Sequence, residues 1–329
     1  MMPADILQHI TLPIAEELHR FDTRYSESIA SPNALLQQVL NHTMQHTGKR
    51  IRPLLVLLSA KALGNINTST IDAAVAFEML HNASLLHDDV VDHADQRRGI
   101  PTVNHLWGNR IAVLVGDYLL AKAIDMATAT GNERIVNALA NVGRHLADGE
   151  LEQLNRQYDA SLDTQTNLRI IDNKTGSLIS ACTSCGAISI GASDDHITLT
   201  QQIGIDIGRC FQIKDDILDY NGTDTGKPTH NDIREGKITL PLICALDTAT
   251  ETERRHIDTQ IHILSSDPDN TQAIHEIADF VEHRHGIELA THVMLQHHRH
   301  ALNHIALLPA NDASRALATL TNYIIERER

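Results

Sequence analysis

This sequence has few aromatic residues, few cysteines and no excess of basic charge. Phe, Trp and Tyr make up only 3% of its 329 residues, which disfavours an aromatic-packed β-sandwich and suits helices packed through aliphatic side chains. The net charge of −15 argues against nucleic acid as a partner, because phosphate neutralisation needs a basic surface. Small phosphorylated ligands are not excluded, because a bound divalent cation can reverse the local field.

Membrane spans and export signals are also missing. No apolar run reaches the roughly 18 residues that cross a bilayer, and residues 1–5 lack the basic and apolar regions of a signal peptide. The four cysteines are scattered and suggest no disulfide framework. We therefore expect a soluble, cytoplasmic protein without a transmembrane segment.

Proline does not occur between Pro101 and Pro228, and apolar residues there recur at spacings of three and four, as in helices. No alternating strand pattern appears, and no Gly/Ser-rich linker divides the chain. The sequence predicts an all-α fold, with residues 1–329 forming a single large helical bundle around a central cavity. Long helices are expected over residues 71–92, 132–158, 164–191 and 198–220.

Two of these helices carry clusters of aspartate within apolar surroundings. The clusters consist of Asp88, Asp89 and Asp92, and of Asp215, Asp216 and Asp219. On a helix, the first and last member of each cluster lie one turn apart on the same face, where like charges repel. Two such clusters facing each other would form a cage of hard oxygen ligands for Mg²⁺ and the oxygens of a diphosphate.

Basic residues gather at two places. The segment Gly48-Lys-Arg-Ile-Arg-Pro53 puts three cations at a predicted loop-to-helix junction, where the helix dipole favours anions. A bound diphosphate would resolve that conflict. Arg97 and Arg98 follow the first Asp cluster, and guanidinium groups suit bidentate contacts to phosphate oxygens. Taken alone, the first segment is equally consistent with an ordinary solvated helix start. Without the adjacent acids, Arg97 and Arg98 would indicate a basic surface turn instead.

In this order, the motifs resemble those of the trans-polyprenyl diphosphate synthases. The similar segments are residues 48–53, 81–92, 97–99, 115–119, 174–176, 211–219 and 226–241. The overall pattern is most similar to the bacterial octaprenyl diphosphate synthases, whose long-chain product supplies the side chain of ubiquinone and related quinones. The resemblance implies an isoprenoid synthase-like bundle that forms a homodimer.

The resemblance also implies a reaction. An allylic diphosphate, with farnesyl diphosphate the expected primer, ionises, and the double bond of isopentenyl diphosphate attacks the allylic carbon. A proton is then lost, and the chain has grown by one isoprene unit. Charge separation in a dry site is the barrier, so cations fixed on the leaving group are the natural catalyst.

Roles for individual residues follow from the same resemblance. The six clustered Asp residues would hold Mg²⁺ ions. The allylic diphosphate would be bound by Arg97, Lys174, Thr175, Gln212 and Lys227, with Thr175 and Gln212 near the allylic carbon. The isopentenyl diphosphate would be bound by Lys49, Arg52, His81 and Arg98.

Product length in this family depends on the residues just before the first Asp, here Ala83 and Ser84. Ser84 lies one helical turn before Asp88 on the same face, along the expected path of a growing chain. Small residues predict an open path and a long product, although they also suit close helix packing. The path would then end at bulkier side chains on the following helix, such as Leu119, Ile124 or Met126.

Four alternatives to a long-chain synthase remain open: a farnesyl or geranylgeranyl diphosphate synthase, a terpene cyclase, a non-catalytic regulatory subunit, and a helical metal-binding bundle. A cyclase lacks the Lys49, Arg52 and His81 set for a second substrate. A regulatory subunit is expected to have lost Asp residues, and both clusters are intact. A carboxylate di-metal bundle is expected to carry Glu-x-x-His pairs.

Three other features are expected to be structural. Cys182 and Cys185 form a C-x-x-C that is expected to be core packing rather than a redox pair. Asp117 lies in an apolar run, and we expect its side chain to be buried and to form a structural pair with another residue. A histidine-rich segment is expected to be a solvated helix face, with adventitious metal binding at most; its members include His297, His298, His300 and His304.

Overall fold

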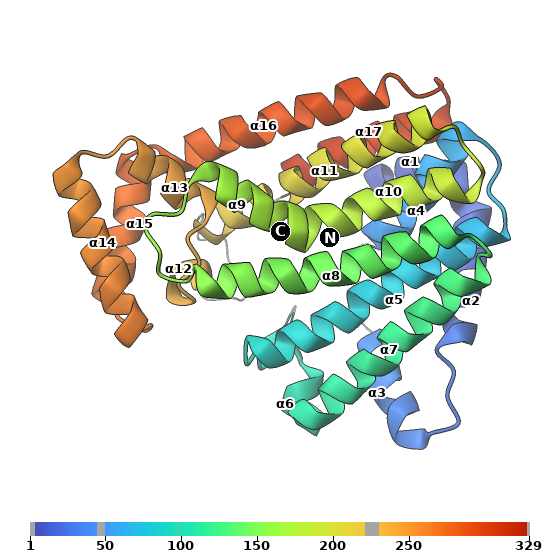
Figure 1. Ribbon diagram of the computed structural model, residues 1–329, viewed down its shortest axis with the longest axis horizontal. Coiled ribbons are helices and arrows are strands. Elements are labelled where there is room, and N and C mark those ends of the chain that lie inside the picture. Colours follow the sequence, from blue (N-terminus) through green and yellow to red (C-terminus); the bar gives the residue numbers. More distant parts are fainter. Residues whose placement is uncertain (1–3, 45–49, 98, 221–229, 328–329) are drawn as a thin grey trace. The chain divides into compact units, whose positions relative to one another are not determined.

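The computed structural model describes residues 4–44, 50–97, 99–220 and 230–327, and these are overwhelmingly helical (Figure 1). The all-α prediction is therefore confirmed. The chain divides into two compact units. Unit 1 comprises Met1–Arg144, Leu178–Gly204 and Leu302–Leu320, and unit 2 comprises His145–Ser177, Ile205–Ala301 and Thr321–Arg329. The single domain over residues 1–329 stays a prediction.

The elements of the first half of the chain are α1 (Ala4–Thr11), η1 (Leu12–Ile14), α2 (Ala15–Ser28), α3 (Ala34–Met44), α4 (Ile51–Leu63), α5 (Thr68–Val91), β1 (Gln96–Arg97), β2 (Ile100–Pro101), α6 (Val103–Trp107), α7 (Asn109–Ala129) and α8 (Glu133–Asn155). The later elements are α9 (Thr164–Ile171), η2 (Asp172–Gly176), α10 (Ser177–Ser189), α11 (Asp194–Tyr220), α12 (Asn231–Arg234), α13 (Leu240–Asp247), α14 (Glu251–Ser266), α15 (Thr271–His283), α16 (Gly286–Ile305) and α17 (Asp312–Glu326).

Helix α5 is the central helix of unit 1. Every residue from 70 to 80 is buried, as expected of a helix covered on all sides. The helix begins in a capping box, in which Asn67 Oδ1 accepts the Thr70 N–H (3.0 Å) and the Thr70 hydroxyl accepts the Asn67 N–H (3.3 Å). Helix α7 runs beside α5 (Figure 1), and α2 and α4 also pack on it. This packing fixes the C-terminal end of α5, where the first Asp cluster lies.

The contact between α5 and α7 is tight at one glycine. A Cβ at Gly116 would lie 2.3 Å from His87 Nε2, so no larger residue fits there without movement. Next to it, Asp117 pairs with His87 at 3.4 Å, but its side chain is 60% exposed. The expectation that Asp117 is buried is therefore wrong, because the apolar run before it covers only one side of α7.

Helix α10 packs against α4 within unit 1 through small residues. A Cβ at Gly186 would lie 2.3 Å from the Val56 carbonyl oxygen, so the two backbones approach closely. Cys182 and Cys185 are fully buried free thiols in this helix, and burial raises the pKa of Cys185 to about 12. A thiol with such a pKa is inert, which agrees with the expected core packing.

Unit 2 has its own apolar core. Helices α13, α14 and α15 pack together (Figure 1), and their buried side chains include Leu242, Ile257 and Ile277. Ile170 of α9 and Tyr220 at the end of α11 join the same cluster. This core holds the end of α11, where the second Asp cluster lies.

Three of the four predicted long helices are confirmed, as α5, α8 and α11. The predicted helix over residues 164–191 is interrupted by η2, a π-helical turn between α9 and α10. A Cβ at Gly208 would lie 2.6 Å from the Gly176 Cα, so η2 packs directly on the backbone of α11. The interruption therefore coincides with a tertiary contact, which the spacing of apolar residues in the sequence does not indicate.

One small strand pair was not predicted. β1 and β2 form an antiparallel hairpin in which Arg97 pairs with Ile100, and Gly99 has a φ of +77°, which glycine adopts readily. Among the described residues, no helix combines the length and the apolarity that crossing a bilayer would require.

Candidate active site

The first Asp cluster lies at the C-terminal end of α5 in unit 1. Asp92 caps the helix, and its N–H donates to the Asp88 carbonyl at 2.8 Å, so the two residues keep their one-turn spacing. Asp89 is only 5% exposed, and the Arg97 Nε donates to its Oδ1 at 2.7 Å. The prediction that Arg97 lies beside this cluster agrees with this geometry.

The turn after α5 holds Arg97 in that position. The Asn104 side-chain amide donates to the carbonyl oxygens of Asp89 (3.2 Å) and Ala94 (3.0 Å). The Thr102 hydroxyl also donates to Ala94 at 2.6 Å. His93 takes a left-handed conformation with a φ of 51°, which is uncommon for a residue other than glycine. These contacts set the direction in which β1 leaves the helix.

Two residues predicted for the isopentenyl diphosphate are described, and both are half-buried in unit 1. Arg52 lies in the first turn of α4, close enough to Cys182 to act on its thiol electrostatically. His81 lies on α5, and its carbonyl accepts the Ser84 hydroxyl at 2.9 Å. Helix α4 begins at Ile51, so the start of the helix predicted within the basic segment is confirmed. Lys49, Arg98 and Lys227 lie outside the described residues.

The residues predicted to govern product length differ in their surroundings. Ala83 is buried and Ser84 is half-buried on α5. On α7, Leu119 and Met126 are buried, whereas Ile124 is 50% exposed. Leu119 and Met126 therefore suit a residue that closes an interior path better than Ile124 does, and the role of all three stays a prediction.

The second Asp cluster lies near the C-terminal end of α11 in unit 2. Asp219 accepts the backbone N–H groups of Asn231 (3.1 Å) and Asp232 (3.0 Å) at the start of α12. Asp216 is 3% exposed and accepts a hydrogen bond from Gln212 at 3.0 Å. The Asp215 side chain is 42% exposed, and it pairs with Arg327 at 2.7 Å.

Carboxylates in this part of unit 2 have pKa values above their ordinary range. Burial, with a smaller contribution from Asp215 and Asp219, raises the pKa of Asp216 to about 7. Burial likewise raises the pKa of Asp219, and burial together with Asp219 and Asp216 raises that of Asp232 well above its usual value. Such shifts are typical of functional sites.

A divalent cation fits this donor set. Asp216, Asp219 and Asp232 bring carboxylate oxygens together in a buried place, where their mutual repulsion and desolvation disfavour the charged forms. An ion with two positive charges offsets both effects, and oxygen-only ligands suit hard cations. The residues present are therefore suited to a divalent metal.

A chain of hydrogen bonds joins three of the predicted residues within unit 2. The Thr175 hydroxyl donates to Gln212 Oε1 at 2.8 Å, and Gln212 Nε2 donates to Asp216 Oδ1 at 3.0 Å. Thr175 belongs to η2, and π-helical turns of this kind are frequent at functional sites. The chain fixes the orientation of the Gln212 amide, whose oxygen points toward η2.

Lys174 precedes Thr175 in η2. Its ammonium group pairs with Glu150 and donates to Gln153, both on α8. Asp172, also in η2, forms two hydrogen bonds with Arg209 at 2.7 and 2.6 Å. The π-helical turn is therefore tied to α8 on one side and to α11 on the other.

A cavity of about 110 Å³ in unit 2 connects these residues. Three of the predicted site residues, Lys174, Gln212 and Asp216, line it together with Asp232 and Lys237. The cavity also has apolar walls, formed by Leu162, Ile170, Ile171 and Ile238. It thus combines cations, carboxylates and an apolar surface.

Three residues that were not among the predicted site residues belong to this site. Asp232 and Lys237 line the cavity, and Lys237 pairs with Glu235. The sequence around them, Asn231-Asp-Ile-Arg-Glu-Gly-Lys237, is rich enough in charge to have indicated them. Arg327 donates to Asp215 and to the Phe211 carbonyl, and its guanidinium lies 4.1 Å from the Phe211 ring centroid. No sequence spacing links Arg327 to α11.

Comparison with known proteins agrees with the resemblance predicted from the motifs. The model of the polyprenyl synthetase family matches residues 33–281. An all-trans-nonaprenyl-diphosphate synthase (geranyl-diphosphate specific) of Rhodobacter capsulatus is 35% identical over 329 residues, covering 99% of each chain. A short chain isoprenyl diphosphate synthase of Methanothermobacter thermautotrophicus is 36% identical over 315 residues, covering 93% of this chain and 95% of the relative. The crystal structure of a decaprenyl diphosphate synthase from Rhodobacter capsulatus superposes with a TM-score of 0.91 at 34% identity, covering 98% of this chain and 99% of that one.

Proposed function

The chain belongs to the polyprenyl synthetase family, whose members are transferases, and we propose that it is a long-chain trans-polyprenyl diphosphate synthase. It would elongate an allylic diphosphate, with farnesyl diphosphate as primer, by head-to-tail addition of isopentenyl diphosphate. The observation that carries this proposal is the cavity of unit 2, where Lys174, Gln212 and Asp216 meet beside apolar walls. Such a cavity offers both a diphosphate site and a surface for a hydrocarbon chain.

Mg²⁺ is the cation that we propose for the two Asp clusters. When bound, it would neutralise charge on the departing diphosphate. The ligands would be Asp88, Asp89, Asp92, Asp215, Asp216 and Asp219. Asp232 adds a carboxylate beside Asp216 and Asp219, and Arg97, already in contact with Asp89, would bind phosphate oxygens at the first cluster.

Lys174 and Lys227 would bind the allylic diphosphate as further cations. Lys174 is held by Glu150 and Gln153, so its ammonium group is positioned before substrate arrives. A positioned cation needs no rearrangement at the moment when charge develops on the leaving group. The diphosphate of isopentenyl diphosphate would be bound by Lys49, Arg52, His81 and Arg98.

Thr175 and Gln212 would stabilise positive charge on the allylic carbon. The Thr175 hydroxyl donates to Gln212, so the lone pairs of the hydroxyl oxygen stay available to face a cation. The Gln212 amide is fixed at both ends by Thr175 and Asp216. Fixed dipoles of this kind stabilise a charged transition state without reorganisation.

For the product, we propose an octaprenyl chain destined for the side chain of a quinone. The small residues Ala83 and Ser84 precede the first Asp cluster and support an open path for chain growth. Two relatives are named for long products, nonaprenyl and decaprenyl, and one for short chains. The buried Leu119 and Met126 on α7 are the side chains proposed to end the path.

A direct test of the reaction class uses the purified chain alone, as the homodimer that we propose. With Mg²⁺, farnesyl diphosphate and labelled isopentenyl diphosphate, label should enter a longer prenyl diphosphate only when both substrates are present. Conversion of farnesyl diphosphate to a hydrocarbon without isopentenyl diphosphate would identify a cyclase. Absence of turnover until a second polypeptide is added would identify one component of a two-component enzyme.

A further inference from the structure

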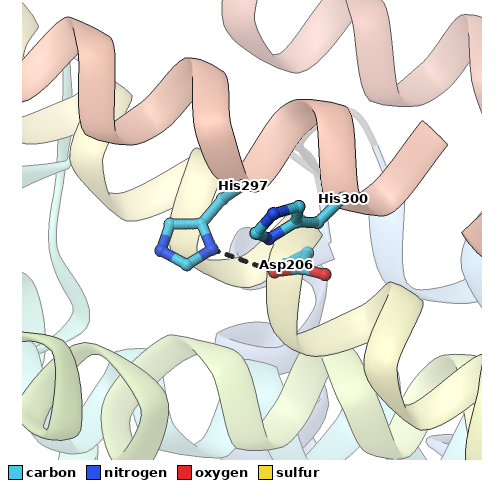
Figure 2. Close-up of side chains that lie close together, drawn as sticks. All are labelled: Asp206, His297 and His300. Carbon is cyan, nitrogen blue, oxygen red and sulfur yellow. Dashed lines mark hydrogen bonds and ion pairs between the residues drawn. The ribbon is translucent and has the colours of Figure 1, made fainter. Parts of the chain in front are cut away.

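A second group of side chains that could hold a metal ion lies in unit 2, apart from the second Asp cluster. Asp206 of α11 and His297 and His300 of α16 converge, with the imidazoles directed toward the carboxylate (Figure 2). One potential ligand atom from each residue lies within 4.8 Å of the other two. His297 Nδ1 and Asp206 Oδ1 are 2.9 Å apart, and the two imidazole centroids are 6.0 Å apart.

We propose that Asp206, His297 and His300 bind a transition-metal ion, with Zn²⁺ the best fit. Two imidazoles and a carboxylate are a ligand set typical of zinc, and water would complete a tetrahedral site. Mg²⁺ fits poorly, because it prefers an octahedral set of oxygen ligands. The site joins α11 to α16 through residues that are 91 positions apart in sequence.

The three side chains differ in exposure in a way that suits a metal site. The Asp206 and His297 side chains are only 8% and 12% exposed, whereas His300 is exposed. A buried carboxylate is costly unless a cation or donors compensate it. The two inner ligands are therefore already in contact, while His300 provides the path by which an ion enters from solvent.

The change in geometry that binding requires is small. Zinc–ligand bonds are about 2.0–2.1 Å, so two ligand atoms of a tetrahedral site lie about 3.4 Å apart. Because His300 is at the surface, side-chain rotation can bring its ring nitrogen to that distance without disturbing the core. Cys210, one turn after Asp206, is not part of the group, and its buried thiol donates instead to the Met294 carbonyl at 3.5 Å.

This group is separate from the second Asp cluster. Asp206 precedes Asp215 on α11 by nine residues, which is about 14 Å along a helix at 1.5 Å per residue. One ion cannot bridge both places. Zinc at Asp206 would instead connect α16 to the helix that carries the cluster, and it would stabilise the folded state by binding it selectively.

The test uses the full chain without an affinity tag, stripped with chelator and then titrated with ZnCl₂ in excess Mg²⁺ by calorimetry. We expect one tight zinc ion per chain and a zinc-dependent rise in Tm. His300→Ala, a change at an exposed residue, should weaken that affinity by about 100-fold or more, since even outer-shell partners are worth about 10- to 100-fold. It should also abolish the rise in Tm.

The matched control is His292→Ala, which removes another exposed histidine of α16 outside the group. It should leave zinc affinity and the rise in Tm unchanged. Equal losses in both variants would show adventitious binding by surface histidines and overturn the proposal. Weak or absent zinc binding by the wild-type chain would overturn it as well, and the His297–Asp206 contact would then be a structural ion pair only.

Discussion

Gln212 shows how much a single side chain contributes to the candidate site. Its amide accepts from Thr175 and donates to Asp216, so it connects η2 with the second Asp cluster. The family resemblance indicated Thr175 and Gln212 as neighbours of the allylic carbon, and the hydrogen bonds supply a physical reason for their orientation. Without Gln212, Asp216 would lose a donor that favours its ionised form.

The raised pKa of Asp216 in this cluster predicts how the stability of the protein depends on pH and on bound Mg²⁺. The folded-state pKa of Asp216 is about 7, above its ordinary value of 3.8. Between those values the folded state binds more protons than the unfolded state, so this residue lowers the stability of the metal-free protein as pH rises from about 4 to about 7. A cation bound to the ionised carboxylate reverses that loss. Mg²⁺ should therefore raise the Tm more at about pH 8 than at about pH 5.

The measurement is the Tm with Mg²⁺ and with chelator at both pH values. In Asp216→Asn, the rise in Tm caused by Mg²⁺ should differ less between the two pH values than it does in the wild-type chain. Asp258→Asn, at an exposed position of α14, serves as the matched control and should preserve that difference. A Mg²⁺ effect that is equal at both pH values in the wild-type chain would contradict the account of the cluster.

Ser84 provides a residue-scale test of product length. Ser84→Phe places a large side chain one turn before Asp88 and should shorten the main product by several isoprene units, because it narrows the proposed path. Ser84→Ala keeps the position small and should leave the product unchanged. Chromatography of the dephosphorylated products measures both, and an unchanged length in Ser84→Phe would remove Ser84 from the path.

At the scale of elements, the sequence predicted helices well and their tertiary interruptions poorly. The apolar periodicity and the cluster of acids were enough to locate α5 and α11 to within a few residues. The break at η2 arises because Gly176 and Gly208 bring two backbones together, and those residues are 32 positions apart. The helix propensities of the residues around each glycine do not indicate such a contact.

The contact between η2 and α11 makes a prediction about stability and activity. A Cβ at Gly208 would lie 2.6 Å from the Gly176 Cα, and backbone atoms cannot move aside cheaply. Gly208→Ala should therefore destabilise the protein by about 1–3 kcal/mol and lower activity by displacing Lys174 and Thr175. Denaturant unfolding and initial rates provide the two measurements.

The matched control for that change is Gly143→Ala on α8, where a Cβ would meet no atom within 4 Å. Alanine favours the helix there, so the variant should gain about 0.5–1 kcal/mol. If both variants behaved alike, the close approach of η2 to α11 would not be the reason for glycine at position 208.

At the scale of the whole molecule, site residues within short motifs could be predicted from the sequence, whereas contacts between residues far apart in sequence could not. Both Asp clusters, Arg97 and the η2 residues were found because short motifs carry them. Arg327 reaches Asp215 across 112 positions, and His297 reaches Asp206 across 91. The histidine-rich helix was expected to be a solvated face, which is wrong for His297 because the pairing with Asp206 buries it.

The central claim is that this chain is a long-chain synthase, and the length of its product tests that claim most directly. The purified chain with farnesyl diphosphate, excess isopentenyl diphosphate and Mg²⁺ should give octaprenyl diphosphate as the main end product, identified by mass spectrometry. Neighbouring long-chain lengths would preserve the class and correct only the number of isoprene units. An end product no longer than geranylgeranyl diphosphate would contradict the claim.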